Sequence, residues 1–235
     1  MADSLGSARA LARASVVADL KAAARRQVAE HGAASLSVRL VARDLGMSSS
    51  AVYRYFSSRD ELLTSLIIDA YDDLGSAVES AESAVPRDQL EARLLAAGLA
   101  VRTWALANRH EYALVFGSPV PGYTAPDATI GPAIRVPSVL SGILRDAWEW
   151  GRLDGAWVPR TAPFLGRDIQ EPPSPLAGLP DDVIVRGILA WTQIFGLVSF
   201  ELFGHLVGSV DDGASFFEAA CDAIARAIGI TPQAD

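Results

Sequence analysis

The chain has 235 residues, of which half are apolar, and it holds a single cysteine, Cys221. This apolar share predicts a sizeable packed core and argues against disorder over most of the length. One cysteine excludes a disulfide framework and a cysteine-ligated zinc site, and it is typical of a reducing cytoplasm. The formal net charge is −8, which at first argues against a nucleic-acid partner.

The charges are unevenly distributed along the chain. Residues 1–60 carry nine basic and five acidic side chains, whereas residues 61–235 carry eleven basic and twenty-three acidic ones. A basic segment ahead of an acidic body predicts a modular protein whose first domain meets an anion.

Helical periodicity starts early in the basic segment. Residues 13–31 are expected to form a first helix that stops at Gly32, because the apolar residues Val17, Leu20, Ala24 and Val28 keep helical spacing. Ser37 is a plausible N-cap for a short second helix that Gly46 ends.

A third and a fourth helix follow closely. The third is expected from Ser48 or Ser49 to Phe56, and the fourth from Ser58, where Ser58 to Glu61 match a capping box. Two short helices joined by a three-residue turn with glycine predict a helix-turn-helix.

The remainder of the chain also has helical periodicity, and no segment reads as a strand. Two Pro- and Gly-rich loops, at 117–132 and 158–180, interrupt it, and loops of this length are usually functional or mobile. Further helices are expected at 87–109, 110–116, 132–153, 181–208 and 213–228. These patterns predict an all-α fold class.

Two features indicate where the protein works. The first sixteen residues, MADSLGSARALARASV, lack the apolar centre of a secretory signal. The most apolar stretch, Ile188 to Phe200, is too short to span a bilayer and precedes Glu201 directly. We therefore expect a cytoplasmic protein without a membrane partner.

The third helix has the layout of a DNA reader. At 100° per residue, Val52 and Phe56 form its buried side, so Arg54 points away from the core between Tyr53 and Tyr55. A central donor can then reach base edges in a major groove, while two hydroxyls reach the phosphates beside it. Ordinary half-buried tyrosines and a solvated arginine are the other interpretation, but the glycine turn and the basic segment favour DNA.

Arg59 adds a second signal. It lies in the first turn of the fourth helix, where a cation is unfavourable against the helix dipole unless an anion binds nearby. A DNA phosphate would supply that anion.

Residues 31–68, HGAASLSVRLVARDLGMSSSAVYRYFSSRDELLTSLI, resemble the DNA-binding segment of the TetR family of bacterial transcriptional regulators. The likeness rests on the glycine after helix one, V-x-x-V-A-x-x-L-G in helix two, A-V-Y-R-Y-F in helix three and the leucines that open helix four. It implies an N-terminal three-helix bundle with a helix-turn-helix, residues 1–60 and ordered from about 13. A long fourth helix would join this bundle to a larger helical effector-binding and dimerisation domain, residues 61–235.

The resemblance also implies which residues meet DNA. The set is Ser37, Arg39, Ser48, Ser49, Ser50, Ala51, Tyr53, Arg54, Tyr55 and Arg59. Ser37 and the two tyrosines would contact phosphates, while Arg54 would face the groove. The family usually has Lys where this chain has Arg59, which keeps the charge. Position 54 varies within the family, so no base preference carries over.

The acidic body offers candidates for an effector site. A narrower likeness, in residues 111–123 and 190–206, points to the TetR subgroup named for its Trp, His and Gly. Aromatic walls with few polar groups are typical of small-molecule sites and also of plain cores. The candidates are Trp104, Tyr112, Phe116, Tyr123, Trp148 and Trp191. No charged anchor stands out among them, which favours an apolar effector.

Two apolar helices near the end of the chain are expected to form a dimer interface. Helix 181–208 is apolar over most of its circumference, so it should be buried on more than one side. The candidate interface residues are Phe195, Leu202, His205, Phe216, Phe217 and Ile224. A four-helix interface between two subunits is what the resemblance implies, and an intramolecular core is the alternative.

The function expected from these features is a transcriptional regulator, a repressor that binds a palindromic operator as a dimer and is released by a small, largely apolar effector. It would be bacterial and nucleoid-associated when bound. An effector-less DNA-binding dimer is the first alternative. A small helical enzyme is disfavoured, because the three histidines have no metal-ligand spacing and no nucleophile motif is present. We expect no cofactor and no metal.

Overall fold

The computed structural model describes residues 2–155 and 162–231. Every regular element within these ranges is a helix, and a lone antiparallel bridge joins Leu153 to Ile230. This confirms the predicted all-α fold class.

The chain divides into two compact units. Unit 1 contains Met1–Ala70 and His110–Thr129, and unit 2 contains Tyr71–Arg109 and Ile130–Asp235. The domain boundary expected between residues 60 and 61 stays a prediction.

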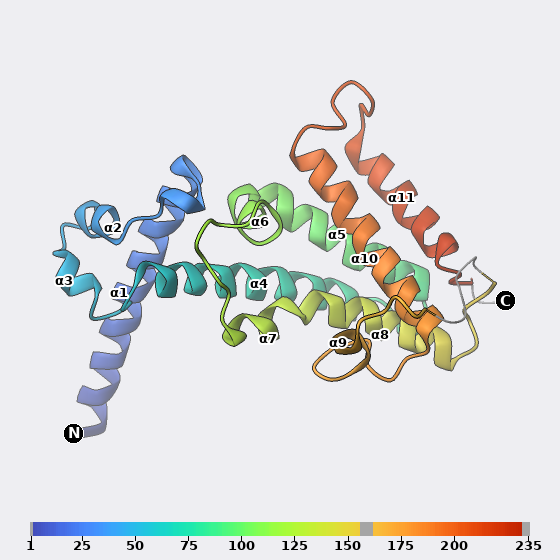
Figure 1. The fold of residues 1–235 in the computed structure, drawn as a ribbon, viewed down its shortest axis with the longest axis horizontal. Helices are drawn as coiled ribbons and strands as arrows, with labels where there is room; N and C mark the ends of the chain where they lie inside the picture. Colours follow the sequence, from blue (N-terminus) through green and yellow to red (C-terminus); the bar gives the residue numbers. More distant parts are fainter. Residues whose placement is uncertain (1, 156–161, 232–235) are drawn as a thin grey trace. The chain divides into compact units, whose positions relative to one another are not determined.

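Unit 1 is organised around its first helix, on which the first helix of the helix-turn-helix packs, while the second helix of that motif packs on the first (Figure 1). Its elements are α1 (Ala2–His31), η1 (Ala33–Ser35), α2 (Val38–Asp44), α3 (Ser49–Val52), the first part of α4 (Arg59–Ser83), nearly all of α6 (Arg109–Phe116) and η2 (Asp127–Thr129). The core is formed by apolar faces of these helices, including Leu20, Val41, Val52, Leu62 and Leu63.

α1 is longer than expected. It begins at Ala2 rather than near residue 13. The apolar spacing that marks a packed helix starts only at Val17, so periodicity alone missed the preceding turns. Residues 2–12 contain four Ala, two Leu, one Arg and no Pro, and Ala, Leu and Arg are the residues with the highest intrinsic helix propensity.

α3 is shorter than expected. The helix ends at Val52 instead of Phe56, and the chain tightens into a turn. The amide of Arg54 bonds the carbonyl of Ala51 at 3.3 Å, and that of Tyr55 bonds the carbonyl of Val52 at 2.8 Å. These are the three-residue spacings of a 3₁₀ turn, which an apolar pattern does not distinguish from the α-helix.

The start of α4 has the predicted cap with one change of partner. The Ser58 hydroxyl accepts the amide of Glu61 at 3.0 Å, as a capping box requires. The Glu61 carboxylate returns to the amide and hydroxyl of Ser57, both at 2.6 Å, instead of to Ser58. These hydrogen bonds from Ser57 lower the pKa of Glu61 below its usual value, which keeps the carboxylate ionised at neutral pH.

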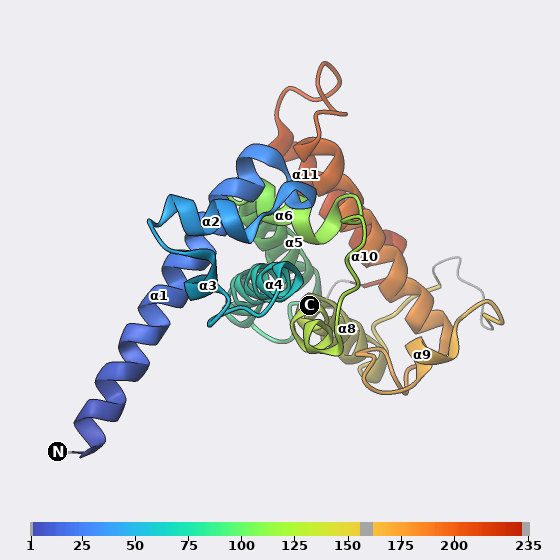
Figure 2. The ribbon, with the colours of Figure 1, turned by 60° about the vertical axis from the view of Figure 1, so that its left-hand side comes forward.

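Unit 2 is a helical domain centred on α5, which packs against α8, α10 and α11 (Figure 2). Its elements are the rest of α4, α5 (Leu90–Ala107), α7 (Ile130–Ala133), α8 (Arg135–Glu149), α9 (Arg167–Gln170), α10 (Asp181–Leu202) and α11 (Gly213–Ala227). Gly98 of α5 allows α11 to approach closely, because a Cβ there would lie 3.0 Å from the sulfur of Cys221. Burial raises the pKa of that thiol to about 12, so it stays protonated and inert at neutral pH.

The two predicted loops contain short helical pieces. η2 and α7 lie in the loop expected at 117–132, and α9 lies in the one expected at 158–180. Part of the second loop falls on residues 156–161, outside the described residues.

α10 ends sooner than the expected residue 208. Its last residue is Leu202, and Gly204 follows with a φ of +81°. A left-handed glycine two residues beyond the last turn terminates a helix, and His205 therefore lies in the turn after α10. By length and composition alone α10 could cross a membrane, and 44% of its most apolar window is buried inside the protein.

A buried ionic network joins three helices of unit 2. The Asp146 carboxylate accepts hydrogen bonds from Arg93 at 2.7 Å and from Arg87 at 2.6 Å. Arg93 also binds Glu82 at 2.6 Å. The Arg93 and Asp146 side chains are only 6% and 4% exposed, so each charge depends on its partner for solvation.

Candidate nucleic-acid interface

The side chains at the end of α3 divide between core and solvent. Val52 is fully buried and Phe56 is 5% exposed, which confirms the predicted buried pair. Tyr53 is 48% exposed, Arg54 is exposed and Tyr55 is half-buried. The segment thus presents a cation between two phenols, a set that can donate to base edges and to phosphates.

The serines before this segment are partly occupied with one another. The Ser48 hydroxyl accepts the amide of Ala51 at 3.2 Å and lies 3.0 Å from the hydroxyl of Ser50. Ser48 and Ser50 are exposed, while Ser49 and Ala51 are half-buried. The start of α3 is therefore a fixed, small-residue surface that a duplex can approach closely.

The start of α2 lies in the same unit. Ser37 is the N-cap residue, as predicted, but its side chain makes no capping bond. Its amide instead donates to the Gln27 side chain at 2.6 Å, a tertiary contact that the local sequence does not reveal. Arg39 is exposed in the first turn of α2.

Arg59 has partners that the sequence did not indicate. Its guanidinium donates to the carbonyl oxygens of Leu36, Ala33 and Ala34 at 3.0, 3.0 and 3.1 Å, and it pairs with Asp60 at 3.0 Å. The side chain therefore closes the turn formed by η1, which leads into α2. Its contact with a DNA phosphate stays a prediction, and the clamp on η1 is a role of its own.

Replacing Arg59 by Met tests the clamp. Hydrogen bonds to charged groups contribute about 1.5–3 kcal/mol each. Because the carbonyls that accept from Arg59 are only partly buried, we expect the free energy of unfolding to fall by about 2 kcal/mol in total. Urea denaturation measures this change. Arg26→Met is the control, because Arg26 forms an exposed pair with Asp44 and should change stability by less than about 1 kcal/mol. If Arg59→Met matches this control, the clamp does not stabilise the fold.

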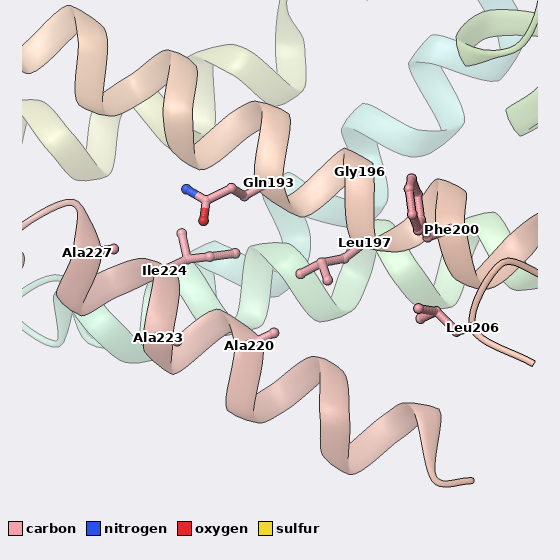
Figure 3. Close-up of a pocket in the computed structure, with 9 residues that line it drawn as sticks. All are labelled: Gln193, Gly196, Leu197, Phe200, Leu206, Ala220, Ala223, Ile224 and Ala227. Carbon is pink, nitrogen blue, oxygen red and sulfur yellow. The ribbon is translucent and has the colours of Figure 1, made fainter. Parts of the chain in front are cut away.

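A second surface lies between α10 and α11. An apolar groove of about 450 Å³ follows these helices, and Gln193, Leu197 and Phe200 of α10 point into it (Figure 3). The lining residues are Gln193, Gly196, Leu197, Phe200, Leu206, Ala220, Ala223, Ile224 and Ala227. Phe200 is 56% exposed, so this groove carries uncovered apolar surface.

The residues predicted for a dimer interface separate into two groups. Phe195, Leu202, Phe217 and Ile224 are buried within the single chain, whereas His205 and Phe216 are exposed. The groove and the exposed Phe200 and Phe203 extend the set. The signal for Phe200 and Phe203 was in the sequence, because both belong to the segment 181–208 that is apolar over most of its circumference.

The six predicted ligand aromatics lie in different parts of the fold. Tyr112 is fully buried in unit 1, with its ring centre 5.0 Å from that of Phe116. The Tyr123 hydroxyl is 2.9 Å from that of Thr64. In unit 2, Trp104 is buried and Trp148 is 41% exposed. Each role as a ligand residue stays a prediction.

Trp191 has a cavity beside it. It lines a hollow of about 90 Å³ between α8, α10 and the segment around α9, together with Leu140, Leu176 and Ile188. Within residues 2–155 and 162–231, no group of three or more His, Cys, Asp or Glu side chains is placed to hold a metal ion.

Comparison with known proteins gives the class. Residues 20–66 match the sequence model of the bacterial regulatory proteins of the tetR family, and residues 94–224 match that of a tetracyclin repressor-like C-terminal domain. The chain is 42% identical over 201 residues to the HTH-type transcriptional regulator Rv1816 of Mycobacterium tuberculosis, which covers 83% of each protein. The HTH-type transcriptional regulator Mb1846 of Mycobacterium bovis gives the same values.

Solved structures agree with this result. The regulatory protein SCO4313 superposes with a TM-score of 0.73 at 33% identity, over 90% of this chain and 96% of that one. A Rhodococcus protein of unknown function has a TM-score of 0.69 at 23% identity, over 91% of this chain and 95% of that one. At this identity the likeness shows the fold alone.

The chain therefore belongs to the TetR family and is a helix-turn-helix transcriptional regulator, not an enzyme. Proteins of this family bind operator DNA as dimers and respond to small molecules.

Proposed function

We propose that this protein is a repressor that binds a palindromic operator as a homodimer, with one helix-turn-helix in each half-site. The observation that carries the proposal is the exposure of Arg54 between Tyr53 and Tyr55, held outward by the buried Val52 and Phe56. In a dimer, two such segments would enter major grooves about one helical turn apart. The protein would act in the cytoplasm of a bacterium, at the nucleoid when bound.

The contacts to DNA would divide between positioning and reading. Ser37, Tyr53 and Tyr55 would bind phosphates, and Arg54 would donate to base edges. Ser48, Ser49, Ser50, Ala51 and Arg39 would line the approach to the groove. Arg59 would act mainly through η1, because three backbone carbonyls already engage its guanidinium.

The dimer would form through the groove between α10 and α11. The apolar lining of the groove, with Phe200 56% exposed, supports this face, because isolated protomers rarely leave such a patch in water. A two-fold axis would place the same patch of each subunit against its copy.

A small, largely apolar effector would control the operator complex. It would bind among the predicted aromatic residues and favour a state in which the two reading heads no longer fit their half-sites. Such control requires different affinities for the two states. An effector-less dimer is the alternative. Isothermal titration would show whether candidate apolar compounds bind the protein. A compound that binds and also lowers the affinity for operator DNA would favour the effector-controlled regulator.

The test of the DNA reader is a pair of substitutions. Arg54→Ala should relax the preference at one base pair of each half-site, by about 1–3 kcal/mol of discrimination. Tyr53→Phe should weaken binding to specific and mutated operators alike, because it removes a phosphate contact. Affinities are measured by fluorescence anisotropy on operator variants found by footprinting the DNA that flanks the gene. Unchanged operator affinity in both variants would rule out this segment as the reader.

A further inference from the structure

The first turns of α1 carry two arginines outside the packed part of unit 1. Residues 9–15 are exposed throughout, with Leu11 at 70%, and the first buried side chain among those described is Leu20. Both views show these turns extending away from α2 and α3 (Figures 1 and 2). Arg9 and Arg13 therefore do not contribute to a core.

Their direction follows from helix geometry. At 100° per residue, Arg9 and Arg13 lie within about 60° of the positions of Leu20 and Ala24 around the helix axis. Leu20 and Ala24 are both fully buried against unit 1. The two arginines are thus on the side of α1 that carries its buried residues, beyond the end of the packed region.

One contact fixes this direction independently. The guanidinium carbon of Arg13 lies 5.0 Å from the centre of the Tyr55 ring, within the range of a cation–π interaction. Tyr55 is one of the two tyrosines that flank Arg54. The N–H donors of a guanidinium lie in its own plane, so stacking on a ring face leaves them able to bind a phosphate in bidentate geometry.

We propose that the first turns of α1 form an additional DNA contact, in which Arg13 and Arg9 bind backbone phosphates flanking each half-site. Four helical residues span about 6 Å, and the phosphates of one strand recur about every 3.4 Å along the duplex axis, so the two arginines meet different phosphates. The inference rests on the proposed function, because it places these phosphates beside the segment that Tyr55 contacts. The match to the family begins at residue 20, so this contact is not part of that likeness.

Such a contact would act without regard to base sequence. It would lengthen the protected DNA at the outer edge of each half-site and raise the number of counterions released on binding.

The test compares Arg13→Ala, Arg9→Ala and the double variant with the unaltered chain on a long operator duplex between 50 and 200 mM salt. Each arginine that binds one phosphate should lower the slope of log affinity against log salt by about 0.9, and the double variant by about 1.8. The ratio of operator affinities, unaltered protein over double variant, should then fall about twelvefold as salt rises from 50 to 200 mM. Ala is the best helix former, so the helix itself is retained, and circular dichroism checks this.

Arg26→Ala is the matched control. It removes one charge from the same helix on a different side, where Arg26 pairs with Asp44, and it should leave the slope unchanged. On a duplex trimmed to the region that the double variant protects, unaltered protein and double variant should bind equally.

The outcomes separate this inference from the proposed function. If the unaltered chain protects an operator and the double variant has the same slope and footprint, the arm contact is wrong and the repressor proposal stands. If Arg13→Ala lowers the slope but Arg9→Ala does not, Arg13 alone binds a phosphate and the two-phosphate contact is overturned. If the unaltered chain protects no operator at any salt, the proposed function itself fails.

Discussion

Phe200→Asp should convert the protein from a dimer into monomers and abolish tight operator binding. Phe200 lines the groove between α10 and α11 and is 56% exposed in the single chain, so the substitution should leave the protomer folded. Burying a Phe side chain contributes about 1.5–3 kcal/mol, and a two-fold interface loses it twice. The dimer should therefore weaken by about 10²–10⁴-fold.

Sedimentation velocity at micromolar concentration measures the loss of dimer, and fluorescence anisotropy measures the loss of operator affinity. Phe164→Asp is the matched control: Phe164 is 69% exposed and lies away from the groove, so dimer and DNA binding should persist. A Phe200→Asp protein that still sediments as a dimer would place the interface elsewhere.

Asp146→Ala should give a large loss of stability. It removes the carboxylate that faces Arg93 at 2.7 Å, both side chains being at most 6% exposed. Breaking a buried pair by deleting one partner costs about 3–5 kcal/mol, because the remaining charge is left without compensation. We expect the free energy of unfolding to fall by about 3 kcal/mol, the lower end of this range, because Glu82 still binds Arg93 at 2.6 Å.

Urea denaturation at one fixed protein concentration measures this change, because assembly also shifts the unfolding midpoint. Asp44→Ala is the control. Its partner is Arg26, and more than half of each side chain is exposed, so that loss should stay below about 1 kcal/mol. Equal shifts for the two variants would mean that the network at Asp146 is not a stabilising element.

The parts of the fold that could be predicted are those that local sequence controls. Helical spacing gave the buried pair Val52 and Phe56, and the cap at Ser58 gave the start of α4 within one residue. The end of α10 was missed although Gly204 offered a signal. A glycine just beyond an apolar helix favours a left-handed stop, and the continuing apolar residues obscured it.

What could not be predicted depends on residues far apart in the chain. Arg59 binds carbonyls 23 to 26 positions earlier, and the amide of Ser37 binds a side chain ten positions earlier. Such partners follow from how helices pack, which one sequence does not specify. The helix dipole predicted an anionic partner for Arg59; in the protein three backbone carbonyls and Asp60 bind its guanidinium, and its contact with a DNA phosphate stays a prediction.

The uncovered face of α10 also bears on gene dosage. By mass action, when chains are scarce relative to the dissociation constant of the proposed dimer, the amount of dimer follows the square of the chain concentration. Halving the chain would then leave about a quarter of the active species. A regulator assembled through this face would therefore release its promoter over a narrow range of its own concentration. Substitutions that change only the apolar dimer contact would shift the concentration at which release occurs and would leave every DNA contact intact.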